Sequence, residues 1–327
     1  MAEIALGLGT SHSSQVSLPP SWWREHAELD RRRAPFEDRL ALLGDKLAPE
    51  IEDDVFTEKY ERCQHAVAIL SERYRSSNVD TVVVVGDDQK ELFDLTNLPA
   101  IGIYCGDEVW DLPPDEIGVA PSHLAARWAV HSDVPDPYPV HRPLALHLIE
   151  VLTESGFDVA QVGGQREGRT IGHAFTFVRR RIVAPAPIRI VPILLNTYYP
   201  PNQPSAARCW QLGKALGEAI RSFPGPERVC VVASGGLSHF VVDEELDRRV
   251  ISSLINRDEA TLGRVTRREL RSGSSEILNW IVTGGSMGGL TMELVDYVPG
   301  YRSLAGTGCG MTFATWGPGE TPAAVSR

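Results

Sequence analysis

Three buried, strand-like runs in the sequence end in polar turns, and two of these turns carry a histidine. The turns are Gly9-Thr10-Ser11-His12, Gly86-Asp87-Asp88-Gln89 and Ser234-Gly235-Gly236-Leu237-Ser238-His239. Open α/β sheets place their ligands at the carboxyl ends of strands. We therefore expect His12 and His239 to converge on one site, although a single histidine taken alone is more often a hydrogen-bonded structural residue.

Histidines at such a place could hold a metal or move a proton. Non-haem iron(II) oxygenases use two histidines and one carboxylate, and leave other positions on the metal open for substrate and oxygen. A histidine also suits acid/base work because its pKa lies close to neutral pH. The chain has 43 acidic residues, so spacing alone does not select the carboxylate. A polar cluster from Gly168 to His173 adds a third histidine.

Two further segments have the composition of a ligand wall. The segment from Asn196 to Pro204 contains Tyr198 and Tyr199 beside amides and prolines, which suits a planar aromatic substrate, although a rigid surface loop has the same composition. The glycine-rich stretch from Gly306 to Gly310 lacks the GxGxxG spacing of a dinucleotide-binding turn. No G-x-S-x-G elbow surrounds Ser234, which argues against a serine hydrolase.

The elements that would position these residues alternate between short β-branched runs and longer helical segments. This pattern predicts an α/β fold with one large domain over residues 1–327, a largely buried central sheet flanked by helices, and an active site at the strand ends. We expect strands at 4–8, 81–85, 99–104, 157–162, 188–194 and 229–233, and helices at 57–75, 143–155, 205–223, 243–256, 258–270 and 275–282. Thr57 is the expected N-cap of the first of these helices. Residues 17–54 are expected to form a loop-rich excursion with short helices, residues 105–140 a long loop over one face, and the C-terminal part a Gly-rich stretch.

Composition excludes several classes of protein. The net charge of −11 is spread along the chain, so nucleic acid is an improbable partner. Five cysteines without a CxxC pair indicate neither a disulfide framework nor a thiolate zinc site, and fit a reducing compartment. The N-terminus lacks the pattern of a secretory signal and no apolar run is long enough to span a membrane. A cytoplasmic protein is therefore expected.

Taken together, four motifs resemble the class III extradiol ring-cleavage dioxygenases, the family of the protocatechuate 4,5-dioxygenase β-subunit. The similarity extends from the first strand to about Phe313. The motifs are, in this order, Gly9-Thr10-Ser11-His12, Gly172-His173, Ser234-Gly235-Gly236-Leu237-Ser238-His239 and Gly273-Ser274-Ser275-Glu276-Ile277-Leu278-Asn279-Trp280.

The resemblance implies a role for each matched residue. His12 would be an iron ligand and Glu276 the carboxylate ligand, although an acid at a helix N-terminus is also favoured by the helix dipole. His239 would deprotonate a catechol and later protonate an oxygen intermediate. His173 would orient a hydroxyl or stabilise an anionic intermediate. We expect further substrate contacts from Asp87, Tyr198, Tyr199 and Thr307.

The chain departs from the family pattern at one metal ligand. The family carries its second histidine ligand in an Asn-Asp-His turn, where this chain has Asp87-Asp88-Gln89. Gln89 could ligate through its carbonyl oxygen, Glu91 or His26 could substitute, or the site could be degraded. The turn also resembles a branch of the family similar to 3-O-methylgallate dioxygenases, which implies retained ring-cleavage chemistry.

The expected function is an Fe(2+)-dependent extradiol dioxygenase that opens a catechol or gallate-like ring with O2. A same-fold enzyme with altered chemistry, such as a metal-dependent hydrolase or an oxygenase for a non-catechol aromatic, is the first alternative. A non-catalytic binding protein is the second. The expected partners are a small aromatic substrate and O2, and the extra length at 17–75 and 105–140 favours a homodimer without a small capping subunit.

Overall fold

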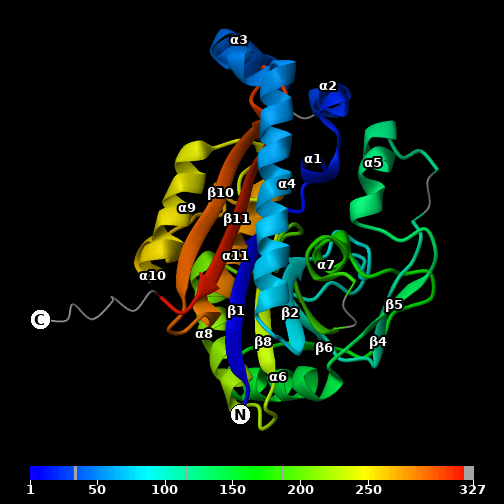
Figure 1. The fold of residues 1–327 in the computed structure, drawn as a ribbon, viewed down its shortest axis with the longest axis vertical. Coiled ribbons are helices and arrows are strands. Elements are labelled where there is room, and N and C mark those ends of the chain that lie inside the picture. Colours follow the sequence, from blue (N-terminus) through cyan, green and yellow to red (C-terminus); the bar gives the residue numbers. More distant parts are fainter. Residues whose placement is uncertain (33–34, 115–116, 186–187, 320–327) are drawn as a thin grey trace, which may run out of the picture.

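A nine-stranded mixed sheet forms the centre of the molecule in the computed structural model, which describes residues 1–32, 35–114, 117–185 and 188–319 (Figure 1). The strand order is β10-β11-β1-β8-β2-β7-β3-β6, and β9 pairs with β11. A separate two-stranded sheet joins β4 and β5. The strands are β1 (Glu3–Thr10), β2 (Thr81–Asp87), β3 (Ile101–Tyr104), β4 (Glu108–Asp111), β5 (Asp136–Pro139), β6 (Ala160–Val162), β7 (Arg189–Leu195), β8 (Arg228–Ser234), β9 (His239–Val241), β10 (Thr291–Tyr301) and β11 (Thr307–Gly317).

Four parallel strands, β1, β8, β2 and β7, form the middle of the sheet. They are rich in valine, isoleucine and leucine because helices cover both faces, which leaves little room for polar side chains. Thr10 lies opposite Ser234 at the carboxyl ends of β1 and β8, and Asp87 ends β2 at the same edge. The expected α/β fold with a buried central sheet is confirmed.

The helices form two layers, one on each face of the sheet. One apolar cluster packs α6, α8, α9 and α11 against one face, and a second packs α4 and α7 against the other. The long helix α4 runs along the sheet in the front of Figure 1. The helices are α1 (Ser14–Ser17), α2 (Trp23–Glu28), α3 (Phe36–Leu47), α4 (Asp53–Ser76), α5 (Pro121–Ala126), α6 (Arg142–Glu154), α7 (His173–Val178), α8 (Ala206–Ser222), α9 (Glu244–Asn256), α10 (Glu259–Gly263) and α11 (Ile277–Ser286), with short 3-10 or π turns between some of them.

Several local expectations were wrong. Helix α4 begins at Asp53, so Thr57 is not its N-cap and instead donates its hydroxyl to the Asp53 carbonyl. Helix α10 ends at Gly263, well before residue 270. The glycine-rich C-terminal stretch forms the two longest strands, β10 and β11, which pair with each other along their length. The 105–140 excursion carries β4, β5 and α5.

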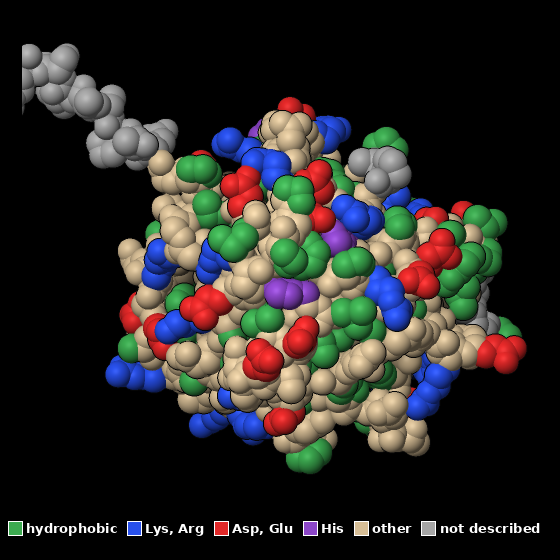
Figure 2. Space-filling model, turned by 90° about the horizontal axis from the view of Figure 1, so that it is seen from below, with side chains coloured by type: hydrophobic (Ala, Val, Ile, Leu, Met, Phe, Trp, Pro, Cys, Tyr) green, Lys and Arg blue, Asp and Glu red, His purple; other side chains and the backbone are tan. Residues whose placement is uncertain are grey.

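Two features bear on the surroundings of the molecule: the distribution of charge on its surface and the apolar character of its helices. Acidic and basic side chains are interspersed on the face seen in Figure 2, without a large area of either sign. Across the described part of the chain, no helix combines the length and the apolar character that a membrane crossing requires.

Candidate active site

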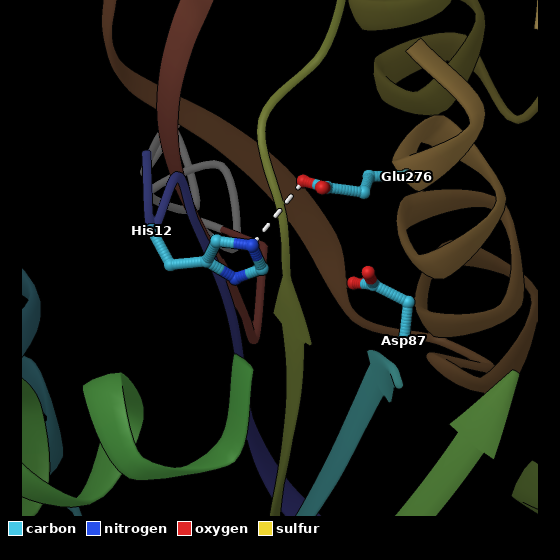
Figure 3. Close-up of side chains that lie close together, drawn as sticks. All are labelled: His12, Asp87 and Glu276. Carbon is cyan, nitrogen blue, oxygen red and sulfur yellow. Dashed lines mark ion pairs between the residues drawn. The ribbon is translucent and has the colours of Figure 1, made fainter. Parts of the chain in front are cut away.

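Strand ends and one helix start bring His12, Asp87 and Glu276 together (Figure 3). His12 follows β1, Asp87 ends β2, and Glu276 immediately precedes α11. One ligand atom from each residue lies within 4.8 Å of the others, and all three side chains are buried. The His12 Nε2 atom is 3.4 Å from Glu276 Oε2. The expected convergence of His12 and Glu276 is therefore seen in the structure, with Asp87 beside them.

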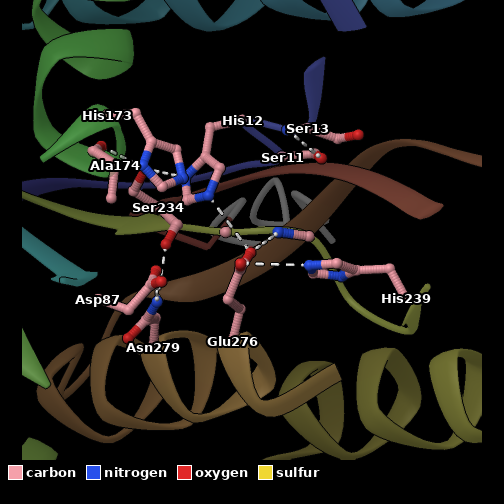
Figure 4. Close-up of polar contacts among 12 residues, drawn as sticks. Ser11, His12, Ser13, Asp87, His173, Ala174, Ser234, His239, Glu276 and Asn279 are labelled. Atoms are coloured by element: carbon pink, nitrogen blue, oxygen red, sulfur yellow. Dashed lines mark hydrogen bonds and ion pairs between the residues drawn. The ribbon is translucent and has the colours of Figure 1, made fainter. Parts of the chain in front are cut away.

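A hydrogen bond at Nδ1, the second ring nitrogen of His12, defines which of its two nitrogens carries a proton (Figure 4). The Ser234 hydroxyl donates to the Ala174 carbonyl at 2.5 Å, so its oxygen accepts from His12 Nδ1 at 3.0 Å. A neutral ring protonated at Nδ1 carries its lone pair on Nε2. That buried Nε2 has no hydrogen-bond partner among the described residues and faces a carboxylate oxygen.

In the neutral form protonated at Nδ1, His12 Nε2 and Glu276 Oε2 are two acceptor atoms that face each other at 3.4 Å, which is an arrangement that a cation completes. The donor set of one imidazole and two carboxylates suits a divalent transition metal. The serine that orients His12 plays the part that an outer hydrogen-bond partner plays for most ligating histidines. The residues present therefore fit a metal ion held by His12 and Glu276.

Glu276 is held in place from several sides. Its Oε2 accepts the Gly236 amide at 2.9 Å, and its Oε1 accepts the Tyr198 hydroxyl at 3.2 Å. Burial alone would raise the pKa of Glu276, but the neighbouring His239 and His12 hold it well below its usual value. The backbone approaches closely here because position 235 is glycine, with φ of +151° and only 2.8 Å between an added Cβ and the Glu276 Cβ.

His239 presents one nitrogen to the same carboxylate. Its Nδ1 lies 2.9 Å from the Leu237 carbonyl, so Nδ1 carries the proton and donates it there. Its Nε2 lies 3.2 Å from Glu276 Oε1. Burial alone would lower the pKa of His239, but the charge of Glu276 raises it well above 6.5. The Nε2 atom of His239 is thus placed to hold or release a proton beside the His12–Asp87–Glu276 cluster.

The His239 ring occupies the space beside residue 273 that a side chain would otherwise fill, because residue 273 is glycine. A Cβ built on Gly273 would lie 1.7 Å from Cδ2 and 1.9 Å from Nε2 of His239. We expect Gly273→Ala to displace the imidazole and to lower kcat by about a hundredfold, because a displacement of about 1 Å at a reacting group costs that much. Steady-state kinetics would measure it. Gly289→Ala, where an added Cβ meets nothing within 4 Å, is the matched control, and wild-type turnover in Gly273→Ala would contradict the assigned place of His239.

His173 is fixed by an ion pair with Glu91. The Glu91 carboxylate contacts Nδ1 of His173 and accepts its backbone amide at 3.1 Å. Burial alone would lower the pKa of His173, but Glu91 raises it to about 10. Burial alone would likewise raise the pKa of Glu91, but His173 lowers it to about 2. His173 therefore stays positively charged at neutral pH, 4.6 Å from the His12 ring between centroids.

The Glu91–His173 pair predicts a pH-dependent stability. The lowered pKa of Glu91 gives stability that is present above pH 4.5 and lost as pH falls through about 2. The raised pKa of His173 gives stability that is present below pH 6.5 and lost as pH rises through about 10. Glu91→Gln should therefore cost about 2 kcal/mol of unfolding free energy at pH 5.5 and much less at pH 10.5. Urea unfolding at both values measures this; an equal cost at both would contradict the ion pair.

Asp87, at the end of β2, and Gln89, in the turn that follows, differ in their burial and in their contacts. Asp87 is fully buried, and its Oδ1 lies 3.4 Å from Asn279 Nδ2. Burial, followed by the charge of Glu276, raises the pKa of Asp87 to about 6. Gln89 donates from Nε2 to Asp87 Oδ2 at 3.1 Å and approaches Glu276 Oε1 at 3.5 Å. Asp87, expected to contact substrate, thus lies beside His12 and Glu276 in the same buried cluster.

A cavity of about 320 Å³ opens over this cluster, large enough for one substituted aromatic ring. Six of the expected site residues line it: His12, Gln89, His173, Tyr198, His239 and Glu276. Tyr199 lies outside this lining, with its ring 4.8 Å from Lys90 Nζ. Thr307 lines a different cavity, which His239 also lines, and its hydroxyl forms a hydrogen bond with that of Ser303.

The two residues suggested as replacement ligands have other partners. Glu91 is engaged by His173 and by the backbone amide of Gln89 at 2.7 Å. His26 lines the cavity, but its Nδ1 lies 3.0 Å from Ser122 Oγ. Sequence reasoning missed Ser234 as the partner of His12; its place at the last position of a buried strand was the available signal.

Comparisons with known proteins identify the family of this chain. The sequence model of the family described as "Catalytic LigB subunit of aromatic ring-opening dioxygenase" matches residues 52–312. A gallate dioxygenase of Pseudomonas putida is 29% identical over 162 residues, which are 45% of this chain and 46% of that protein. A 2,3-dihydroxyphenylpropionate/2,3-dihydroxicinnamic acid 1,2-dioxygenase of Azotobacter vinelandii is 28% identical over 166 residues, half of each chain. The chain spans about half the length of the curated relatives it matches, and the family match covers most of its own length. This chain belongs to the family of the catalytic LigB subunit of aromatic ring-opening dioxygenases.

Proposed function

We propose that the protein is an iron(II)-dependent extradiol dioxygenase that opens the ring of a catechol or gallate-like aromatic with O2. One observation carries the proposal: the two oxygens of the buried Glu276 carboxylate face His12 Nε2 at 3.4 Å and His239 Nε2 at 3.2 Å. A metal-ligand pair and an acid/base group thus share one carboxylate. The names of the relatives, which act on gallate and on a dihydroxyphenyl acid, support the substrate class.

His12 and Glu276 would hold the iron. When bound, the ion supplies a Lewis acid that lowers the pKa of the ring hydroxyls and gathers substrate and O2 at one place. A cation on Glu276 would also offset the negative charge that raises the pKa of His239. His239 Nε2 could then accept a hydroxyl proton near neutral pH and return it to an oxygen of the opening ring.

His173 and Tyr198, which also line the cavity, would interact with negative charge on the substrate or on oxygen. His173, kept protonated by Glu91, would stabilise negative charge on the deprotonated substrate or on reduced oxygen. Burial, followed by the charge of Glu276, keeps the pKa of Tyr198 well above 10, so its hydroxyl stays a neutral donor. Both side chains line the same cavity as His12 and His239.

Oxygen consumption tests the proposal. Anaerobically iron-loaded protein, mixed with a panel of catechols, gallates and methylated gallates, should consume one O2 per ring opened and form a product with a new visible or near-ultraviolet absorption. Protein without iron should do neither. Substrate conversion without oxygen uptake would show a hydrolase, and would contradict the proposed chemistry.

The proposal also covers the cellular compartment of the protein and its oligomeric state. All five cysteines are buried and unbonded, which supports a reducing compartment such as the cytoplasm. We propose a homodimer. It should need no small capping subunit, because the 105–140 segment of the chain itself contributes His123 to the wall of the cavity. Light scattering coupled to size exclusion would measure the mass; a co-purifying small polypeptide would contradict this arrangement.

A further inference from the structure

Two acidic side chains are buried side by side at the metal-ligand cluster. Asp87 is 0% and Glu276 1% exposed, and one oxygen of each lies within 4.8 Å of the other and of a ring nitrogen of His12. Within the described ranges neither carboxylate forms an ion pair with a lysine or arginine. The ion pair of Glu276 with His239 supplies one positive charge for the two buried carboxylates, and a second buried negative charge without a partner is costly. A divalent ion would balance both charges, whereas a protonated His239 would balance only one.

The amide of Gln89 faces this cluster with its nitrogen. The terminal atom that approaches Asp87 Oδ2 at 3.1 Å and Glu276 Oε1 at 3.5 Å has acceptors on both sides, so it must be the donating Nε2. The carbonyl oxygen, which is the atom able to bind a metal, is then the end that does not contact the carboxylates. The Gln89 backbone is held as well, because its amide donates to Glu91 at 2.7 Å.

We infer that Asp87 is the third protein ligand of the metal, and that Gln89 is a positioning residue that orients the Asp87 carboxylate. This centre of one histidine and two carboxylates would replace the family pattern of two histidines and one carboxylate. The inference rests on the proposed function only for the presence of a divalent metal. Harder oxygen donors favour manganese and magnesium more than imidazole does, so this centre should bind Mn(II) well.

Titration of the metal-free protein with Mn(II), followed by the electron paramagnetic resonance of free Mn(II), tests the assignment at pH 7.5. Asp87→Asn should bind Mn(II) at least about a hundredfold more weakly, because a charged ligand is lost. Gln89→Ala should weaken binding about tenfold, as expected for an outer hydrogen-bond partner. Asp111→Asn removes an equally buried charge in β4, whose hydrogen-bond partners are His131, Ser132 and Tyr138 and no residue of the cluster, and its Mn(II) affinity should match the wild type.

Either of two results would overturn the inference: wild-type affinity in Asp87→Asn, or a loss in Gln89→Ala as large as that in Asp87→Asn. Gln89 is partly exposed in a turn, so Gln89→Ala remains decisive if Asp87→Asn does not fold. A near-complete loss of binding in Gln89→Ala would make the amide the ligand. The titration uses neither substrate nor O2, so a failure of the proposed ring cleavage would leave this result unaffected.

Thermal unfolding gives a second readout on the same variants. Asp87→Asn removes one of two neighbouring buried charges, so the metal-free variant should melt at or above the wild-type temperature. Saturating Mn(II) should raise the melting temperature of the wild type and of Asp111→Asn, and should raise that of Asp87→Asn much less. An equal rise in Asp87→Asn would contradict the assignment.

Discussion

His239→Ala is expected to lower kcat by about a thousandfold and to leave the iron content unchanged. The Nε2 atom of His239, beside the Glu276 carboxylate, is the proposed proton-accepting group, and a positioned acid/base group contributes about 10²- to 10⁴-fold to a rate. Its ring is not a member of the His12–Asp87–Glu276 cluster, so the metal should remain. Anaerobic metal analysis and initial rates of oxygen uptake measure the two effects separately.

The comparison needs a histidine variant outside the cavity. His65 is exposed on α4, so His65→Ala should keep both iron and turnover. If His239→Ala lost iron and turnover together, His239 would be a ligand and the assignment of the proton transfer would be wrong. Wild-type turnover in His239→Ala would remove the acid/base role altogether.

Glu276→Gln is expected to reduce iron affinity by at least about a thousandfold and to abolish oxygen uptake. The substitution keeps the size of the side chain but removes the charge that faces His12, and a neutral amide is a much weaker ligand than a carboxylate. The variant should also lower the pKa of His239, because the charge that raises it is gone. Iron analysis after anaerobic reconstitution measures the first effect.

An exposed glutamate provides the control for charge alone. Glu245 lies exposed on α9, so Glu245→Gln changes the net charge by the same amount without touching the cavity. It should bind iron as the wild type does. Full iron content in Glu276→Gln would show that this carboxylate only fixes the start of α11, the structural role that its sequence position also allowed.

Local sequence patterns predicted the central strands well. β1, β2 and β8 are short runs of buried aliphatic residues that end in polar turns, and each turn lies at the edge expected from parallel pairing. The C-terminal strands β10 and β11 were missed because glycines and scattered polar residues hide the alternation that marks a strand. Their stability comes from pairing with each other and, for β11, with β1, which is a property of the tertiary structure.

The site was predictable only where a motif fixed it. His12, His239 and Glu276 were assigned by resemblance, and the structure brings their side chains together as that assignment requires. The relation of Asp87 to Gln89 could not be read from their order, since which of two residues in a turn faces the cluster depends on the backbone of the turn. The place of Ser234 at the end of a buried strand marked it as a candidate, but its hydrogen bond with His12 is visible only in the structure.

Anomalous diffraction from crystals grown anaerobically with Fe(II), recorded on both sides of the iron absorption edge, locates the metal directly. The predicted result is one strong peak within bonding distance of His12 Nε2 and the Glu276 carboxylate, with the His239 ring next to it and unbonded. A peak bound instead to His239, His173 or His26, or no peak between His12 and Glu276, would contradict a metal centre built on these two residues.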